Sequence, residues 1–240
     1  MGTVLFAWEL GGGLGHVGPM RVLAERLVQL GHQPVFAVRE VATARSCLGH
    51  LGPILQAPFT RTPSMQGQAF GAGNLADILA LRGFADPVEL RAMVHSWADV
   101  FQVLRPGLLV ADFSPTALVA AHGALPIVIV GYGFHVPPTH LQTFPSFRDD
   151  VPPVVGEQAI LANVRHVLTQ RKQTPLKSLP SLFRAHYTHC YSLPWLDPYS
   201  HYRRGSALGP SNLCQNGQIL RRSHPYSRIF LLSILRFRTQ

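Results

Sequence analysis

Strand-like and helix-like segments alternate along the first 135 residues, and this alternation limits the possible fold more than any other feature of the chain. Short apolar runs typical of buried strands occur at Val4–Trp8, Pro34–Val38, Ile54–Gln56, Leu108–Ala111 and Ile127–Val130. Between them, the spacing of apolar residues predicts helices over Val17–Leu30, Val41–Leu48, Leu75–Leu81, Pro87–Leu104 and Ser114–Ala121. Strands joined by helical crossovers form a parallel sheet with helices on both faces. We therefore predict an α/β fold with a Rossmann-like, doubly wound parallel sheet.

The alternation loosens after His135 but does not stop. A proline-rich loop extends to Pro153, and the pattern then predicts a helix over Glu157–Gln170, a short helix over Ser178–Arg184 and a strand over Thr188–Leu193. We assign residues 1–210 to one Rossmann-like domain. Residues 211–240 contain no acidic residue and no strand–helix alternation, which predicts an irregular basic tail. We favour a truncated or frameshifted end for this tail; the alternative is that Ile229–Leu235 makes a weak contact with a membrane surface.

The formal net charge of +9 raises the question of a nucleic-acid partner, but the distribution of charge argues against one. All 12 acidic residues lie at or before Asp197, whereas seven arginines and no acid follow it. A domain that binds nucleic acid carries its positive charge on a folded face, so we expect no nucleic-acid partner. The three cysteines lie far apart, and no basic segment precedes the first strand, so we expect a cytoplasmic protein without disulfides or a metal site.

A glycine-rich loop, Gly11-Gly12-Gly13-Leu14-Gly15, separates the first strand from the first helix. Glycines let the backbone turn sharply and leave room for a ligand, so we predict that Gly12, Gly13 and Gly15 bind substrate. The same stretch contains G-x-G-x-x-G at Gly13, Gly15 and Gly18, with Glu40 after the second strand. This leaves an NAD(P)-dependent oxidoreductase or another nucleotide binder as an alternative. The match is weak, because Trp8-Glu9-Leu10 stands where that motif has its first glycine.

His16 ends the glycine loop and is a candidate general base, since imidazole exchanges protons near neutral pH. Such a base needs a carboxylate to orient it. Asp112 follows the fourth strand, which neighbours the first strand in a doubly wound sheet, so both residues are expected at the carboxyl edge. The alternative roles are structural: His16 at the helix start, and Asp112 as a cap for the helix that begins near Pro115.

At this point a family resemblance becomes specific. The opening of the chain resembles that of the GT-B glycosyltransferases, both the UDP-glycosyltransferase (GT1) type and the family-28 type related to MurG, in Gly15-His16, Pro19, Arg21–Leu30, Gly31-His32 and Pro34–Val38. Three later segments also resemble these enzymes: Leu108–Asp112, the strand with the histidine-orienting aspartate; Ala124–Phe134, the next strand; and Asp197–Pro210, the approach to the interdomain linker. The similarity covers roughly residues 3–210.

The resemblance implies an inverting transfer of a sugar from a nucleotide-sugar donor to an acceptor hydroxyl, with no further cofactor. His16 would deprotonate the hydroxyl, and Asp112 would hold the imidazole. The acceptor pocket would be lined by Phe59, Phe70, Phe134 and His135. The donor motif of the family, a His-Cys-Gly run with downstream hydroxyl and acidic residues, is absent. We therefore expect an acceptor-binding half that is inactive alone; the alternative is a non-catalytic subunit of a split transferase, completed by a partner chain that carries a donor domain.

Overall fold

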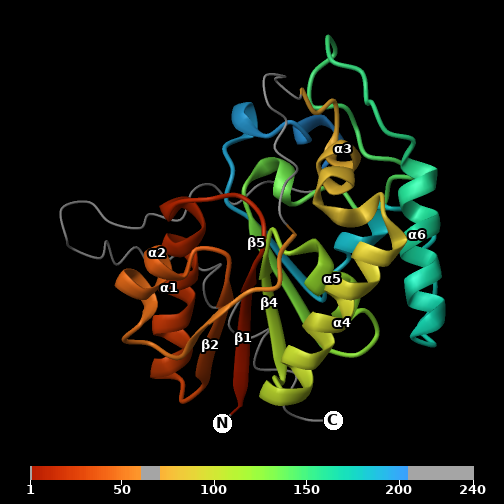
Figure 1. Cartoon of the computed structure of the whole chain (residues 1–240). Helices are drawn as coiled ribbons and strands as arrows, with labels where there is room; N and C mark the ends of the chain where they lie inside the picture. Colours follow the sequence, from red (N-terminus) through yellow and green to blue (C-terminus); the bar gives the residue numbers. More distant parts are fainter. Residues whose placement is uncertain (1, 61–70, 205–240) are drawn as a thin grey trace.

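The computed structural model describes residues 2–60 and 71–204 of the 240-residue chain. Its centre is a six-stranded, all-parallel sheet with the strand order β3-β2-β1-β4-β5-β6 (Figure 1). The strands are β1 (Thr3–Trp8), β2 (Gln33–Val38), β3 (Ile54–Gln56), β4 (Leu108–Asp112), β5 (Ile127–Gly131) and β6 (Tyr187–Cys190). The predicted α/β class and doubly wound sheet are therefore confirmed.

The strands read as continuous apolar runs because the sheet is covered on both faces. One face is packed by α1 (Leu14–Gln29) and α2 (Val41–Leu48), around a core that includes Phe6, Trp8 and Phe36. The other face is covered by α3 (Leu75–Leu79), α4 (Pro87–Leu104), α5 (Pro115–Ala121) and α6 (Glu157–Gln170) (Figure 1). Strand β1 lies between β2 and β4, so its carboxyl end is in the middle of the sheet edge.

Helix boundaries follow local chemistry. The side chain of Asn74 accepts hydrogen bonds from the amides of Ala76 and Asp77 at the start of α3, and Asp86 caps α4 in the same way through Val88 and Glu89. Pro115 occupies the first turn of α5, where its missing N–H costs nothing. Helix α4 ends at Leu104, and the following residue, Arg105, adopts the left-handed conformation with φ 47°.

The structure differs from the sequence prediction at several boundaries. Helix α1 begins at Leu14, inside the glycine loop, rather than at Val17. The helix expected over Leu75–Leu81 ends at Leu79 and continues as a π-helical turn over Ala80–Phe84, where Gly83 has φ 89°. The short helix expected over Ser178–Arg184 is a 3-10 turn at Pro180–Phe183, and the strand expected over Thr188–Leu193 is β6, which ends at Cys190.

Buried Asp77 ties two loops together on the α3 side of the molecule. Its carboxylate accepts hydrogen bonds from the backbone N–H groups of Gly73, Val154 and Val155, at 2.8–3.1 Å. This contact anchors the proline-rich segment before α6 to the segment before α3. Several predictions lie outside the described residues: Phe70 in the acceptor pocket, the tail over residues 211–240 and its possible membrane contact. Within the described residues, no helix is both long and apolar enough to cross a membrane.

Candidate active site

The predicted site residues come from two neighbouring strands. Strands β1 and β4 pair in parallel with Trp8 opposite Asp112, so the chain segments that leave them start side by side. From β1 the chain passes through Gly11–Gly13 and enters α1, which carries His16 in its first turn. Asp112 is the last residue of β4. Both side chains lie at the carboxyl edge of the sheet, where open α/β sheets bind their ligands.

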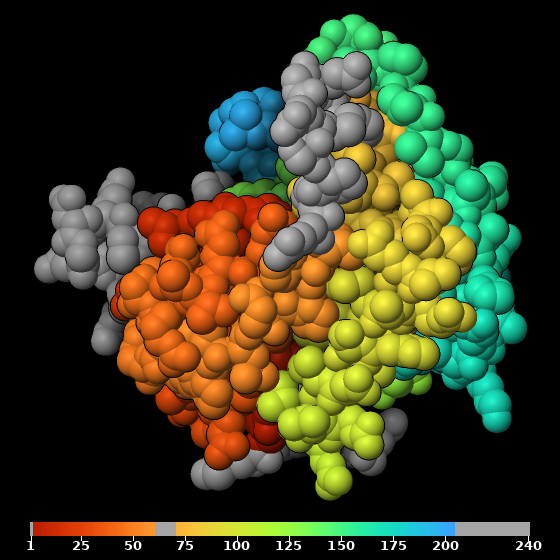
Figure 2. Space-filling model, in the orientation of Figure 1, coloured from red at the N-terminus to blue at the C-terminus, as the bar shows by residue number. Residues whose placement is uncertain are grey.

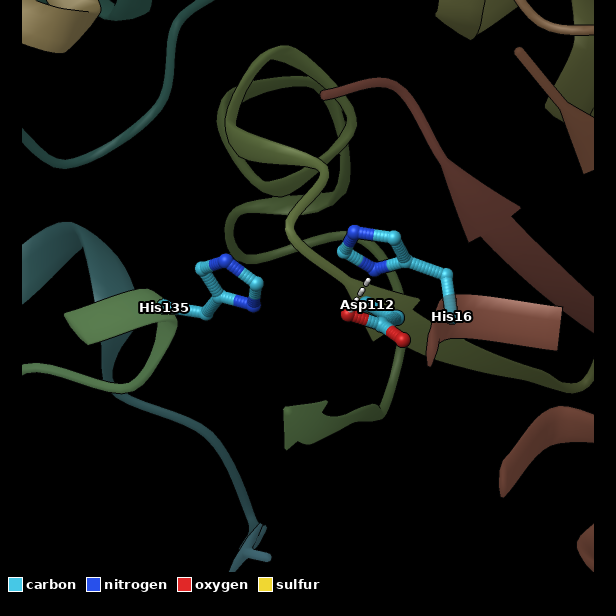
Figure 3. A group of neighbouring side chains, drawn as sticks. All are labelled: His16, Asp112 and His135. Carbon is cyan, nitrogen blue, oxygen red and sulfur yellow. Dashed lines mark hydrogen bonds and ion pairs between the residues drawn. The ribbon is translucent and has the colours of Figure 1, made fainter. Parts of the chain in front are cut away.

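His16 and Asp112 form a buried hydrogen bond (Figure 3). The Nδ1 atom of His16 lies 3.0 Å from Oδ1 of Asp112, and the two side chains are 7% and 0% exposed. A carboxylate at Nδ1 favours the tautomer that carries its proton there, which leaves the lone pair on Nε2 to accept a proton. Burial raises the pKa of Asp112, while its hydrogen bond to His16 works in the opposite direction. The expected convergence of the two residues is present, and their catalytic roles remain a prediction.

Two aromatic rings pack against the His16 imidazole with nearly parallel planes. The ring of Trp8 lies at a centroid distance of 4.9 Å and that of His135 at 5.2 Å. Phe113 stacks in turn on His135 at 4.2 Å. Packing against two rings restricts the rotation of the imidazole, so His16 is preorganised before any ligand arrives.

His135 is part of this stack, although the sequence suggested it as a lining residue of the acceptor pocket. It is 8% exposed, and burial together with the nearby His16 lowers its pKa from 6.5 to about 3. The imidazole of His135 is therefore neutral at physiological pH. Two buried atoms here have no hydrogen-bond partner among the described residues: Nδ1 of His135 and Oδ2 of Asp112.

Gly11 makes room for the imidazole and was missed as a site residue. A β-carbon at this position would lie 2.3 Å from Nε2 of His16, so only a residue without a side chain fits there. Gly11 also has φ 84°, a conformation that glycine adopts without strain. As the first glycine of the loop it was visible in the sequence, but nothing in the sequence indicated that it packs against a ring five positions later.

Two of the other loop glycines contact a carboxylate, whereas the β-positions of Gly13 and Gly15 face open space. The backbone N–H of Gly13 donates to Oε2 of Glu40 at 3.2 Å, and a β-carbon on Gly12 would lie 2.7 Å from Oε1 of the same residue. Gly15 has no heavy atom within 4 Å of its β-position. A carboxylate bound to the Gly13 amide repels a phosphate that would approach the same amide.

Glu9, also missed as a site residue, fixes the turn that follows Asp112. Its buried carboxylate accepts hydrogen bonds from the Ser114 hydroxyl, from the amide and hydroxyl of Thr116 and from the amide of Ala117, at 2.7–3.2 Å. The Glu9 carboxylate thus lies at the N-terminus of α5 and stabilises the turn that contains Phe113, whose φ is 46°. Burial raises the pKa of Glu9 from 4.5 to about 7, although these donors favour the charged form. The signal in the sequence that could have identified Glu9 is its position as an acidic residue directly after a buried strand.

The predicted aromatic lining is only partly assembled. Phe134 contacts His135 and Phe113 edge-on, at centroid distances of 4.2 and 5.6 Å. Phe59 is 42% exposed, and its ring lies 5.7 Å from the guanidinium carbon of Arg39. The structure therefore brings Phe134 into the ring cluster around His16, while Phe59 contacts the cationic side chain that follows β2.

The segment after β6 returns to the site through Arg203, a third missed residue. Arg203 pairs with Asp197 and donates to the backbone carbonyls of Val136 at 2.7 Å and of Gly133 at 2.9 Å. These carbonyls flank the 3-10 turn Gly133–His135, which carries His135. Segment 194–204, drawn in blue, stands above the carboxyl ends of the strands in Figure 1 and is visible at the surface in Figure 2. The ion pair holds this segment on the site.

His16, Asp112 and His135 are also close enough to be tested as metal ligands, because one donor atom of each lies within 4.8 Å of the others. His16 Nδ1 and Asp112 Oδ1 are already hydrogen-bonded to each other, so one donor atom of each residue is used within the pair. This arrangement favours a hydrogen-bonded His16–Asp112 pair over a metal site.

Comparisons with known proteins identify the fold. No family model and no curated protein sequence matches the chain. Among solved structures, CalG4, the calicheamicin glycosyltransferase, has 18% identity over 88% of this chain and 53% of its own, with a TM-score of 0.58. The kitacinnamycin glycosyltransferase has 14% identity over 92% and 53%, with a TM-score of 0.55. VinC, solved in complex with dTDP, has 13% identity over 86% and 52%, with a TM-score of 0.51.

The fold is thus that of the GT-B glycosyltransferases, as the sequence resemblance implied. The chain spans about half the length of the solved structures it matches.

Proposed function

We propose that residues 1–210 form the acceptor-binding half of an inverting glycosyltransferase that uses a nucleotide-sugar donor. The observation that carries this proposal is the buried His16–Asp112 hydrogen bond at the carboxyl edge of a parallel sheet. A neutral imidazole oriented by a carboxylate is the arrangement that removes a proton from a hydroxyl group. The shared fold with CalG4 and VinC supports the class of reaction.

In this mechanism the acceptor hydroxyl approaches Nε2 of His16 beside Gly11, and its proton moves to that nitrogen as its oxygen attacks the anomeric carbon. Asp112 stabilises the imidazolium that forms and keeps its proton on Nδ1. The new bond forms on the face of the sugar opposite the departing nucleoside diphosphate, which accounts for inversion. The rings of Trp8 and His135 hold the imidazole in plane throughout.

The donor must be bound by further polypeptide, in the same chain or in a separate partner chain. Exposed apolar side chains support a docking surface for it near the carboxyl edge. Leu14, the first residue of α1, is 65% exposed, and Trp195 and Leu196 are 77% and 68% exposed. Leu196 belongs to the segment against Gly133, next to the ring stack. Exposed apolar side chains that form a contiguous patch mark interaction sites. The cytoplasm as the place of action stays a prediction from the cysteines.

The test has two stages. First, the 240-residue chain is titrated with a panel of hydroxyl-bearing acceptors while the imidazole resonances of His16 are followed by NMR. An acceptor that saturates and shifts these resonances supports the proposal, whereas a broad panel without any response contradicts acceptor binding at His16. Second, transfer from UDP- and dTDP-sugars to that acceptor is measured by mass spectrometry, without and with a donor-binding domain supplied in trans or by fusion.

We expect negligible transfer by the chain alone and robust transfer with the donor domain. In the completed enzyme, His16→Ala should lower kcat by roughly 10²–10⁴-fold, the usual contribution of a general base. Asp112→Asn should produce a smaller loss of kcat with a shifted pH profile. Robust transfer by the chain alone would refute the half-enzyme proposal, and transfer that survives His16→Ala would refute the assigned base.

A further inference from the structure

A second concave site lies at the opposite edge of the sheet from His16. It is a cavity of about 750 Å³ beside Pro126–Ile127, at the start of β5, and Ala185–His186, directly before β6. The remaining wall comes from the end of α5, from Thr139–Gln142 and from Thr174–Ser181. This volume is within the range of roughly 300–1,000 Å³ that small-molecule sites occupy. Neither the proposed mechanism nor the resemblance to glycosyltransferases uses this site.

The wall of the cavity is cationic and carries no carboxylate. Its charged lining residues are Lys177 and Arg184, and its titratable lining residues are His122, His140 and His186. The chain has no acidic residue from Phe113 to Arg148, nor from Gln158 to Leu196, so both stretches that form the wall are free of negative charge. A cleft lined by one sign of charge concentrates ligands of the opposite sign.

Carbonyl groups at the end of α5, which would repel an anion, already have hydrogen-bond donors. Arg171 donates to the carbonyl of Ala120 at 3.2 Å, the side-chain amide of Gln173 donates to that of His122, and Ala124 N donates to that of Ala121. Arg165 holds the facing wall by donating to the carbonyls of Leu176 and Lys177, at 2.8 and 3.0 Å. The negative end of the helix is thus compensated, and both walls are fixed before a ligand binds.

Two histidines of the wall have assigned ring protons. The Nε2 atom of His122 lies 3.0 Å from the carbonyl oxygen of Thr174, so Nε2 is the donor there. Ile127 N donates to Nδ1 of His186 at 3.1 Å, which places the proton of the neutral His186 ring on Nε2. The apolar lining, which includes Leu125, Pro126 and Leu176, suits the uncharged part of an organic ligand.

We propose that this cavity binds an organic phosphate, with the phosphoryl group held by Lys177 and Arg184 and the apolar part against Leu125 and Leu176. The assignment is independent of the proposed transferase function. Lysine and arginine are the side chains that bind phosphate through charge-assisted hydrogen bonds. The lining hydroxyls of Thr139 and Thr174 are of the type that adds further contacts to phosphate oxygens. Those of Ser178 and Ser181 already donate to the backbone carbonyls of Leu141 and Ser178.

The test is a ¹H–¹⁵N NMR titration of the 240-residue chain with phenyl phosphate. We expect saturable shifts of the amides around Ile127 and His186, and weaker binding of inorganic phosphate, which lacks the apolar part. The double variant Lys177→Ala with Arg184→Ala should raise the dissociation constant for phenyl phosphate by roughly tenfold or more. Both side chains are exposed, so the double variant should keep its fold.

The matched control is Arg45→Ala with Lys172→Ala, which removes the same charge at exposed positions outside the cavity. Equal weakening by both double variants would mean non-specific attraction to a basic chain and would overturn the proposal. Phenol binding as tightly as phenyl phosphate would overturn the phosphate assignment, and so would shifts confined to the His16 edge. His16→Ala should leave the titration unchanged, which separates this result from a failure of the transferase proposal.

Discussion

Glu9 offers a direct test of how burial controls the chemistry around the site. Its carboxylate is fully buried, and desolvation raises its pKa from 4.5 to about 7 in the folded chain. Between these values the folded state holds one proton more than the unfolded state at this residue. The free energy of unfolding must therefore fall as pH rises through this window. A shift of this size corresponds to about 3 kcal/mol, since one pKa unit is worth about 1.4 kcal/mol.

The variant Glu9→Gln isolates this contribution because glutamine does not titrate. Its amide changes the hydrogen bonds to Ser114, Thr116 and Ala117, but by an amount that does not depend on pH. We expect wild type to lose up to about 3 kcal/mol relative to Glu9→Gln between pH 4.5 and pH 7.5, most of it above pH 5. Urea unfolding followed by the fluorescence of buried Trp8 and Trp97 measures the difference.

Glu25→Gln is the control, because Glu25 is a carboxylate on the surface of α1 that pairs with Arg21. Parallel stability curves for wild type and Glu9→Gln would show that the four donors compensate burial completely. A wild type that gains stability relative to Glu9→Gln as pH rises would show that they outweigh it. Either result would refute the reasoning that desolvation dominates at this carboxylate.

Three further predictions concern the geometry of the site. Gly11→Ala should break the His16–Asp112 hydrogen bond, which NMR would detect as loss of the downfield Nδ1 proton. The control is Gly13→Ala: Gly13 has φ 79° but no atom near its β-position, so this variant should show backbone strain and keep the proton. Loss of the proton in both variants would contradict the steric argument. The free energy of unfolding of His135→Phe should rise relative to wild type by up to ~1.4 kcal/mol for each pH unit below pH 6.5. The reason is that the pKa of His135 is lowered to about 3 in the folded chain, so only the unfolded wild type takes up the proton. A difference in urea unfolding that does not change with pH would contradict this. Arg203→Leu should destabilise the fold by about 3 kcal/mol or more, because it leaves the carboxylate of Asp197 buried without its cation. A thermal denaturation midpoint equal to that of wild type would rule out a stabilising role for the Arg203–Asp197 ion pair.

The arrangement of the sheet could be predicted because it depends on local periodicity and a few topological rules. Apolar runs and helical spacing located the first five strands to within one residue at each end, and the strand order of a doubly wound sheet makes the first and fourth strands neighbours. The meeting of His16 and Asp112 follows from these rules, since both residues leave the carboxyl ends of adjacent strands. The sequence by itself therefore determined the fold class and the edge at which the site lies.

Only the tertiary structure decided which side chains complete that site. Glu9 bonds to residues more than 100 positions away, Gly11 is matched to the ring of His16, and the ring stack joins residues from three different crossovers. The cationic cavity likewise combines chain segments about 50 residues apart. Periodicity reports which face of an element is buried, but it carries no information on which distant group fills a given space. Close packing in three dimensions makes that choice, and so these contacts could be found only in the folded chain.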